Sequence, residues 1–121
     1  LLGGEINKDT KFADNDHRNY NIKGEAFDIG DTFSGVDFFK GLEAIEEIKN
    51  IIPKNFNLAQ FALKWILMHE EVSVVIPGAV NALQVDKNCL TSNLDDIDEL
   101  MPKIKKIYED YVKDDVHHRW N

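Results

Sequence analysis

The feature that most constrains the fold of this 121-residue chain is an apolar run followed by a proline–glycine turn and a helical pattern. Residues 72–76, V-S-V-V-I, are mostly β-branched, as is typical of a strand that is buried on both faces. Pro77 and Gly78 end this strand, and the apolar residues between Leu83 and Leu90 are expected to turn inward on a helix. Because a strand, a glycine turn and a helix form half of a βαβ unit, the sequence predicts an α/β fold.

The turn after this strand has features of an anion-binding site. It would present backbone N–H groups and a helix N-terminus at the carboxyl end of a parallel strand, where phosphates commonly bind. The alternative is a plain connection between strand and helix, since one proline–glycine turn is weak evidence for a binding site. The residues alone leave both interpretations open.

Charge and composition limit the partners and the compartment. The formal net charge is -8, with 22 acidic residues against 14 basic ones, so a polyanion such as nucleic acid would be repelled. No apolar run approaches the length of a membrane span, and no signal-peptide pattern is present. We therefore predict a soluble, cytoplasmic protein without nucleic-acid or membrane partners. A single cysteine, Cys89, fits a reducing cytosol and is expected to be a small buried group.

The chain divides into a long polar loop, residues 1–36, and a part with helices and the strand 72–76, residues 37–121. The loop shows neither a helical nor an alternating pattern, and loops of this length inside a domain are often functional. It contains spaced aromatic residues that could hold it onto a surface, namely Phe12, Tyr20, Phe27 and Phe33. The alternative is that the loop is disordered in this chain.

Two helices with clear start signals follow the loop. Asp37 is the expected N-cap of a helix over residues 38–52, whose apolar residues follow helical spacing. Asn57 and Gln60 form the N-x-x-Q pattern of a capping box, and the mostly apolar residues 58–69 continue as a second helix.

A last helix is predicted over residues 94–111, where an apolar stripe recurs at helical spacing. Pro102 lies inside this pattern and should kink or split the helix. After it, Val116 and Trp120 are expected to pack the C-terminal tail against the body.

A metal site near the C-terminus is a weaker hypothesis. His117 and His118 lie beside Asp114 and Asp115, but adjacent histidines do not share a helix face. No second cluster of ligands accompanies them in the sequence. We therefore expect no metal site here.

Several motifs recur in a fixed order along the chain. Residues 76–88 have the pattern I-P-G-A-x-N-A-x-Q-x-x-x-N, which resembles the late cofactor-binding motif of the aldo-keto reductases. Residues 1–5 resemble the segment after the family's sixth strand, and residues 58–67 resemble the helix before its seventh strand. Residues 16–18, 24–27 and 32–36 resemble the long loop of one bacterial branch, and residues 116–120 resemble an ending seen in that branch. The ordered set is more specific than any single motif.

The resemblance implies that this chain is the C-terminal portion of a (β/α)₈ TIM barrel, mainly helical here, with one or two short strands. A closed barrel takes about 250 residues, more than the chain has. The family reduces aldehydes and ketones by hydride transfer from NADPH or NADH. It does so with a tyrosine, a lysine, an aspartate and a histidine on the first half of the barrel. No tyrosine of this chain matches the catalytic position, so no catalytic residue is assigned, and the chain alone is expected to be inactive.

The same resemblance implies five cofactor-binding residues. Gly78 and Ala79 would offer backbone N–H groups beside the ribose phosphate. Gln84 and Asn88, four positions apart on one helix face, would meet the adenine. Arg18 would close over the phosphates from the long loop.

The cofactor is expected to be NADP, or else NAD, and to bind weakly. Lys87 stands where many members have a glutamate, and its ammonium is in reach of a phosphate, which favours NADP. The alternative for Gln84 and Asn88 is that they are two polar residues on a solvated helix face.

Three classes of function follow. The first is a portion of an oxidoreductase whose partner is the missing N-terminal half of the barrel. The second is a non-catalytic nucleotide-binding or interaction module, and the third is a structural remnant. In every case residues 72–76 would lack neighbouring strands, so we expect self-association through this unpaired edge.

Overall fold

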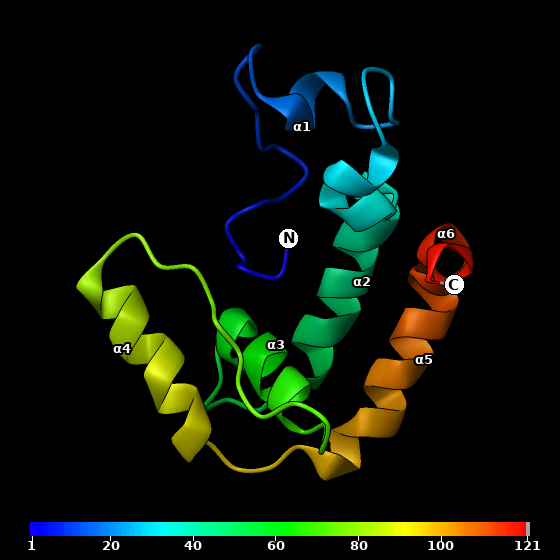
Figure 1. The fold of residues 1–121 in the computed structure, drawn as a ribbon. Helices are drawn as coiled ribbons and strands as arrows, with labels where there is room; N and C mark the ends of the chain where they lie inside the picture. The colour runs from blue at the N-terminus through cyan, green and yellow to red at the C-terminus, as the bar shows by residue number, and fades with distance from the viewer. Residues whose placement is uncertain (121) are drawn as a thin grey trace.

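The computed structural model describes residues 1–120 of the chain, and the elements of this part are all helical (Figure 1). The longer helices are α2 (Phe38–Ile51), α3 (Leu58–Leu67), α4 (Ala82–Leu90) and α5 (Met101–Tyr111). Short helices are α1 (His17–Tyr20), α6 (Lys113–Val116) and the 3₁₀ turns η1 (Ile29–Asp31), η2 (Phe33–Gly35), η3 (Thr91–Asn93), η4 (Asp98–Leu100) and η5 (His117–Arg119).

The helix starts at α2 and α3 confirm the capping signals in the sequence. The Asp37 carboxylate accepts hydrogen bonds from the backbone N–H groups of Phe39 and Lys40, at 3.0 and 3.1 Å. Asn57 Oδ1 accepts from the Gln60 N–H at 2.8 Å, and Gln60 Oε1 accepts from the Asn57 N–H at 3.3 Å. Both caps satisfy backbone donors that the first helical turn leaves without partners.

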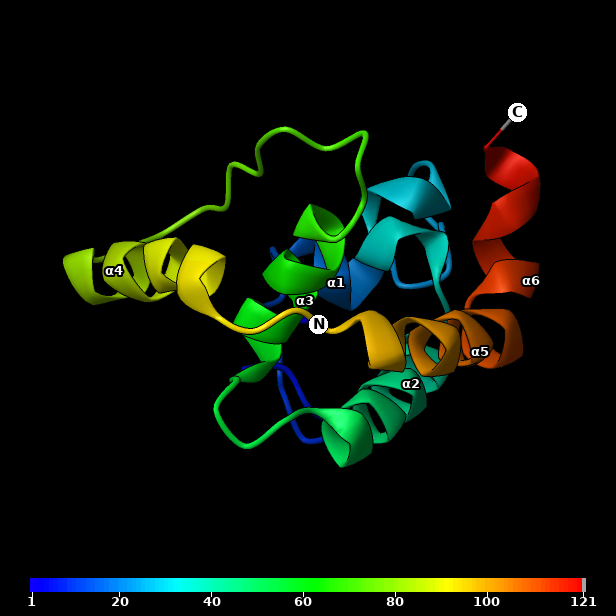
Figure 2. The same cartoon turned by 90° about the horizontal axis from the view of Figure 1, so that it is seen from below.

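The core lies where α2, α3 and α5 meet. Phe56, Phe61 and Ile97 are its buried centre, and partly buried side chains from α2 and α5 pack around them. Helices α2 and α5 run side by side, whereas α4 lies on the opposite side of the molecule from α5 (Figures 1 and 2). The fold is therefore a helical cluster with one outlying helix, α4.

The strand expected at residues 72–76 is not confirmed, because no strand occurs in the described part of the chain. This segment runs in extended form between α3 and α4, with Val74 69% and Ile76 90% exposed. Within residues 1–120, the N–H and C=O groups of residues 73–79 make no backbone hydrogen bond. A strand requires a neighbouring strand for those bonds, and this chain places none beside it.

The apolar residues of α4 do not turn inward, which corrects the prediction from the helical pattern. Leu83 is 62% exposed, Leu90 is 53% exposed, and Cys89 is exposed as well. Within the described residues, α4 packs mainly against α3 and η3, and its apolar residues remain exposed.

The final helical region is split at Pro102, as one of the two expected outcomes. Helix α5 begins at Met101 with Pro102 in its first turn, where a missing N–H leaves no helical bond unmade. Residues 94–97 precede it without helical structure. In the C-terminal tail Val116 is buried, whereas Trp120 is largely exposed and stacks on Tyr108 with ring centroids 5.9 Å apart.

The polar loop over residues 1–36 is held to the start of α2 by aromatic contacts, in agreement with the spacing of its aromatic residues. The Phe33 ring lies 5.0 Å from that of Phe38, the first residue of α2, and Phe12 packs against both. Tyr20 and Phe27 form a separate edge-to-face pair. Among the described helices, none has both the length and the apolarity that crossing a membrane requires.

Candidate functional site

One cavity in the described chain has a volume of about 890 Å³. Its walls come from the N-terminal segment, the region between the end of α2 and the start of α3, and one face of α4. Four of the five residues expected at the cofactor site line it, namely Arg18, Gly78, Gln84 and Asn88. Ala79 is not among the lining residues. Residues from the long loop, the glycine turn and α4 are thus brought to one cavity.

The face of α4 that lines the cavity is polar. Gln84 and Asn88 are the half-buried residues of this helix, and its other residues are exposed. The Gln84 N–H donates to the Asn81 cap at 2.9 Å, and Gln84 Oε1 accepts from the Val80 N–H at 2.8 Å. The first bond uses the backbone N–H of Gln84 and the second its side-chain oxygen, so neither occupies its amide NH₂ group. The half-burial disagrees with the alternative of a fully solvated face.

The charge of this cavity is opposite to that of the whole chain. Four cations line it, Arg18, Lys49, Lys54 and Lys87, against one carboxylate, Glu5. Arg18 and Lys49 form ion pairs with Asp16 and Glu46, so the excess of positive charge comes mainly from the two other lysines. In a chain of net charge -8, this local excess of positive charge favours an anion at this place over any other ligand class.

Sequence reasoning missed Lys49 and Lys54. They lie at and just beyond the C-terminal end of α2, far in sequence from the cofactor motif. Only the packing of α2 against α3 and the N-terminal segment brings them to the cavity. No local pattern distinguishes them from other surface lysines.

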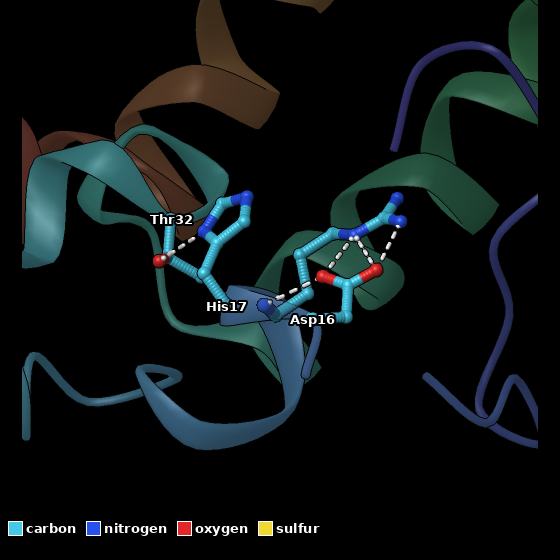
Figure 3. A network of polar contacts seen from close by, with 4 residues as sticks. Asp16, His17 and Thr32 are labelled. Carbon is cyan, nitrogen blue, oxygen red and sulfur yellow. Dashed lines mark hydrogen bonds and ion pairs between the residues drawn. The ribbon is translucent and has the colours of Figure 1, made fainter. Parts of the chain in front are cut away.

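Arg18 is fixed in place by two residues of its own loop. Its Nε donates to both carboxylate oxygens of Asp16 at 2.9 and 3.2 Å, and its Nη2 donates to Oδ2 at 2.6 Å (Figure 3). Its Cζ also lies 4.7 Å from the centre of the Phe12 ring. The Arg18 hydrogen bond lowers the pKa of Asp16 to about 2. The Nη1 group makes no hydrogen bond in the described structure, so it remains free to bind an anion.

A buried polar network holds the short helix that carries Arg18. Asn21 and Thr32 are almost completely buried. Asn21 Oδ1 accepts from the N–H groups of Ala26 and Phe27 at 2.8 and 2.9 Å, and its Nδ2 donates to Thr32 Oγ1 at 3.1 Å. The same hydroxyl lies 3.0 Å from His17 Nδ1 (Figure 3). Sequence reasoning did not single out Asn21, because a loop asparagine carries no signal of its long-range partner.

A further polar contact lies near the C-terminus, outside this cavity. The hydroxyl of Tyr108 lies 2.8 Å from His117 Nδ1, but neither residue lines the cavity. In residues 1–120 no group of three or more His, Cys, Asp or Glu residues is placed to hold a metal ion.

Comparison with known proteins gives one match. A sequence model of the aldo/keto reductase family matches residues 1–109. The chain belongs to this family. Members of the family are oxidoreductases that generally bind NAD(P)H, and the family's fold is the TIM barrel. Neither the search of curated proteins nor that of solved structures gives a match.

The chemical groups of NAD(P)H can be compared with the side chains that line the cavity. The cofactor carries phosphates, an adenine and riboses, which require cations and amide hydrogen-bonding groups. The cavity offers both kinds, cations at Arg18 and Lys87 and amides at Gln84 and Asn88. Gly78 has open space in front of its Cα, since a Cβ there would meet no atom within 4 Å. The donor set therefore fits the phosphate and adenosine end of such a cofactor.

Proposed function

We propose that this chain forms part of an NAD(P)H-dependent aldo/keto reductase acting on aldehydes or ketones, and that it binds the phosphate and adenosine end of the cofactor. The observation that carries the proposal is the cavity itself. Arg18, Gly78, Gln84 and Asn88 come from three separate segments and line one cation-rich space. This convergence is expected of a nucleotide site and would be a coincidence for scattered surface residues.

Each lining group has a distinct part in this proposal. Arg18 donates to phosphate oxygens through the Nη1 group that Asp16 leaves free. Gln84 and Asn88 hydrogen-bond the adenine from the half-buried face of α4. Lys87 adds a cation beside them, which favours NADP over NAD because NADP carries one more phosphate.

Hydride transfer requires the cofactor and catalytic residues that have no match in this chain. We propose the N-terminal half of a barrel as the partner that provides them. Alone, the chain is expected to show no NADPH oxidation with a panel of aldehydes, because no tyrosine lines the cavity to donate the proton. Turnover that survives removal of contaminating enzymes would contradict this expectation.

A second candidate is a nucleotide-binding module without catalysis. The observation that favours it is that the cavity has its cations and amides, while Tyr20, Tyr108 and Tyr111 do not line it. The two candidates share the binding site and differ in the need for a partner. Turnover regained on adding the N-terminal half would separate them.

Binding is tested by calorimetric titration of the chain with NADP⁺. We expect weak affinity, because a half-site lacks the nicotinamide contacts and the preorganisation of a closed barrel. Asn88→Ala should weaken binding about five-fold or more, as expected for the loss of a ligand hydrogen bond. The matched control is Asn50→Ala, the same change at an exposed position of α2 that does not line the cavity. Equal affinities for the two variants would contradict the proposed site.

A further inference from the structure

The C-terminal segment of the chain contacts the long loop at one ion pair and the start of α2 at another. The Arg119 guanidinium forms an ion pair with Asp28, which lies just before η1. The Asp115 carboxylate accepts from the backbone N–H of Asp37 at 3.0 Å and from Lys40 Nζ at 2.8 Å. These contacts join residues 75 to 91 positions apart, at the place where α6 lies near the start of α2 (Figure 1).

Apolar packing accompanies the two ion pairs. Val116 is 3% exposed, between the residues that form them. A Cβ at Gly35, in η2, would lie 3.8 Å from Val116 Cγ1 and 3.7 Å from Arg119 Nη1. The tail therefore packs directly on the backbone of η2, and the ion pairs fix an interface that is already closed.

Hydrogen bonds connect the part of the loop that the tail contacts with the segment that carries Arg18. Thr32 lies between η1 and η2, is 1% exposed, and contacts both His17 and Asn21. His17 begins the four-residue helix α1, and Arg18 follows it in that helix. A continuous set of contacts thus runs from Arg119 to Arg18.

We propose that Arg119 is a positioning residue for the phosphate subsite: together with Val116 it holds η1 and η2, and thereby holds Arg18 at the cavity. This inference rests on the proposed nucleotide site. Neither residue lines the cavity, so their effect on a phosphate ligand passes through the loop. The tail would also order the loop when no ligand is bound.

The test uses Arg119→Ala in the 121-residue chain, with two readouts. The first is hydrogen exchange at the amides of Ala26 and Phe27, which are bonded to Asn21. The second is the dissociation constant for NADP⁺. Because an exposed ion pair shifts an equilibrium by up to about five-fold, we expect exchange two- to five-fold faster and affinity two- to five-fold weaker.

Two further variants distinguish the loss of the Arg119–Asp28 contact from the loss of the Arg119 charge. Gly30→Ala keeps both charged groups, but its Cβ would lie 2.8 Å from Arg119 Nη2 and 2.8 Å from Asp28 Oδ1, so it should displace the ion pair. The charge swap Asp28→Arg with Arg119→Asp should restore part of the lost affinity. The matched control is Lys106→Ala, which breaks the ion pair with Asp110 on α5 and touches neither the loop nor the cavity.

The outcomes are distinguishable. If the unmodified chain binds no NADP⁺, the proposed function fails, and hydrogen exchange alone decides whether the tail orders the loop. If the chain binds NADP⁺ but Arg119→Ala matches Lys106→Ala in both readouts, the inference is overturned. Faster exchange with unchanged affinity would also overturn the positioning role. If Arg119→Ala does not fold, the same comparison is made with Gly30→Ala.

Discussion

The orientation of the Arg18 guanidinium is set by neighbours within six positions of the sequence. Its position beside the cavity depends on residues much further away in the chain. Asp16 and Phe12 fix the guanidinium, and both follow from local loop structure. Its approach to Gln84 and Asn88 depends on how the loop and α4 are placed. At the scale of single residues, the resemblance of the motifs therefore named four of the lining residues, missed Lys49 and Lys54, and could not show that the four converge.

The Asp16–Arg18 pair predicts a specific pH dependence. The pKa of Asp16 lies at about 2, below its ordinary 3.8, chiefly because Arg18 donates to the carboxylate. The unfolded chain takes up this proton at a higher pH than the folded chain does. The contact therefore stabilises the folded state above about pH 4, and its contribution disappears as the pH falls toward 2.

The measurement is an NMR titration of the Asp16 carboxyl carbon. Arg18→Ala should raise the pKa of Asp16 toward 3.8, whereas Lys106→Ala should leave it unchanged. A midpoint near 3.8 in the unmodified chain would show that the pair does not form in solution.

At the scale of elements, the sequence predicts what local interactions decide. The starts of α2 and α3 follow from Asp37 and from the Asn57–Gln60 box, because a cap is satisfied within three residues. The strand over residues 72–76 was not confirmed, since its hydrogen bonds need a second strand. The prediction that the apolar residues of α4 turn inward was wrong for a similar reason, because apolar residues are buried only where another element covers them.

The unpaired segment over residues 72–76 predicts self-association. It is extended, its N–H groups beyond Val72 lack partners within the described chain, and Val74 and Ile76 are exposed. Such an edge tends to pair with another strand. If two copies of the chain paired their segments antiparallel, the backbone N–H and C=O groups of both segments would gain hydrogen-bond partners. We expect the sedimentation coefficient to rise with concentration.

Val74→Lys should reduce this association, because it places like charges on the paired segments. Val85→Lys is the matched control, a substitution of another exposed valine on α4. A monomer at every concentration, with protected amides throughout residues 72–76, would show that this segment has an internal partner instead.

At the scale of the whole molecule, the described chain leaves an apolar space uncovered. A second cavity of about 740 Å³ lies among α2, α3 and α5, and Trp65, Ile66 and Ile107 line it. In a TIM barrel, helices of this kind pack their apolar faces on strands. The family and the helical order were accessible from the sequence, whereas the open cavity and the contribution of Lys49 and Lys54 depend on packing over the whole chain.

We propose that the cation-rich cavity binds the phosphate and adenosine end of NADP. The most direct measurement is a titration of the isotope-labelled chain with NADP⁺, followed by amide NMR. We expect shifts that concentrate at Gly78, Ala79, Gln84 and Asn88 and at the backbone amide of Arg18. Shifts confined to His117 and His118, or no shifts at millimolar NADP⁺, would contradict it.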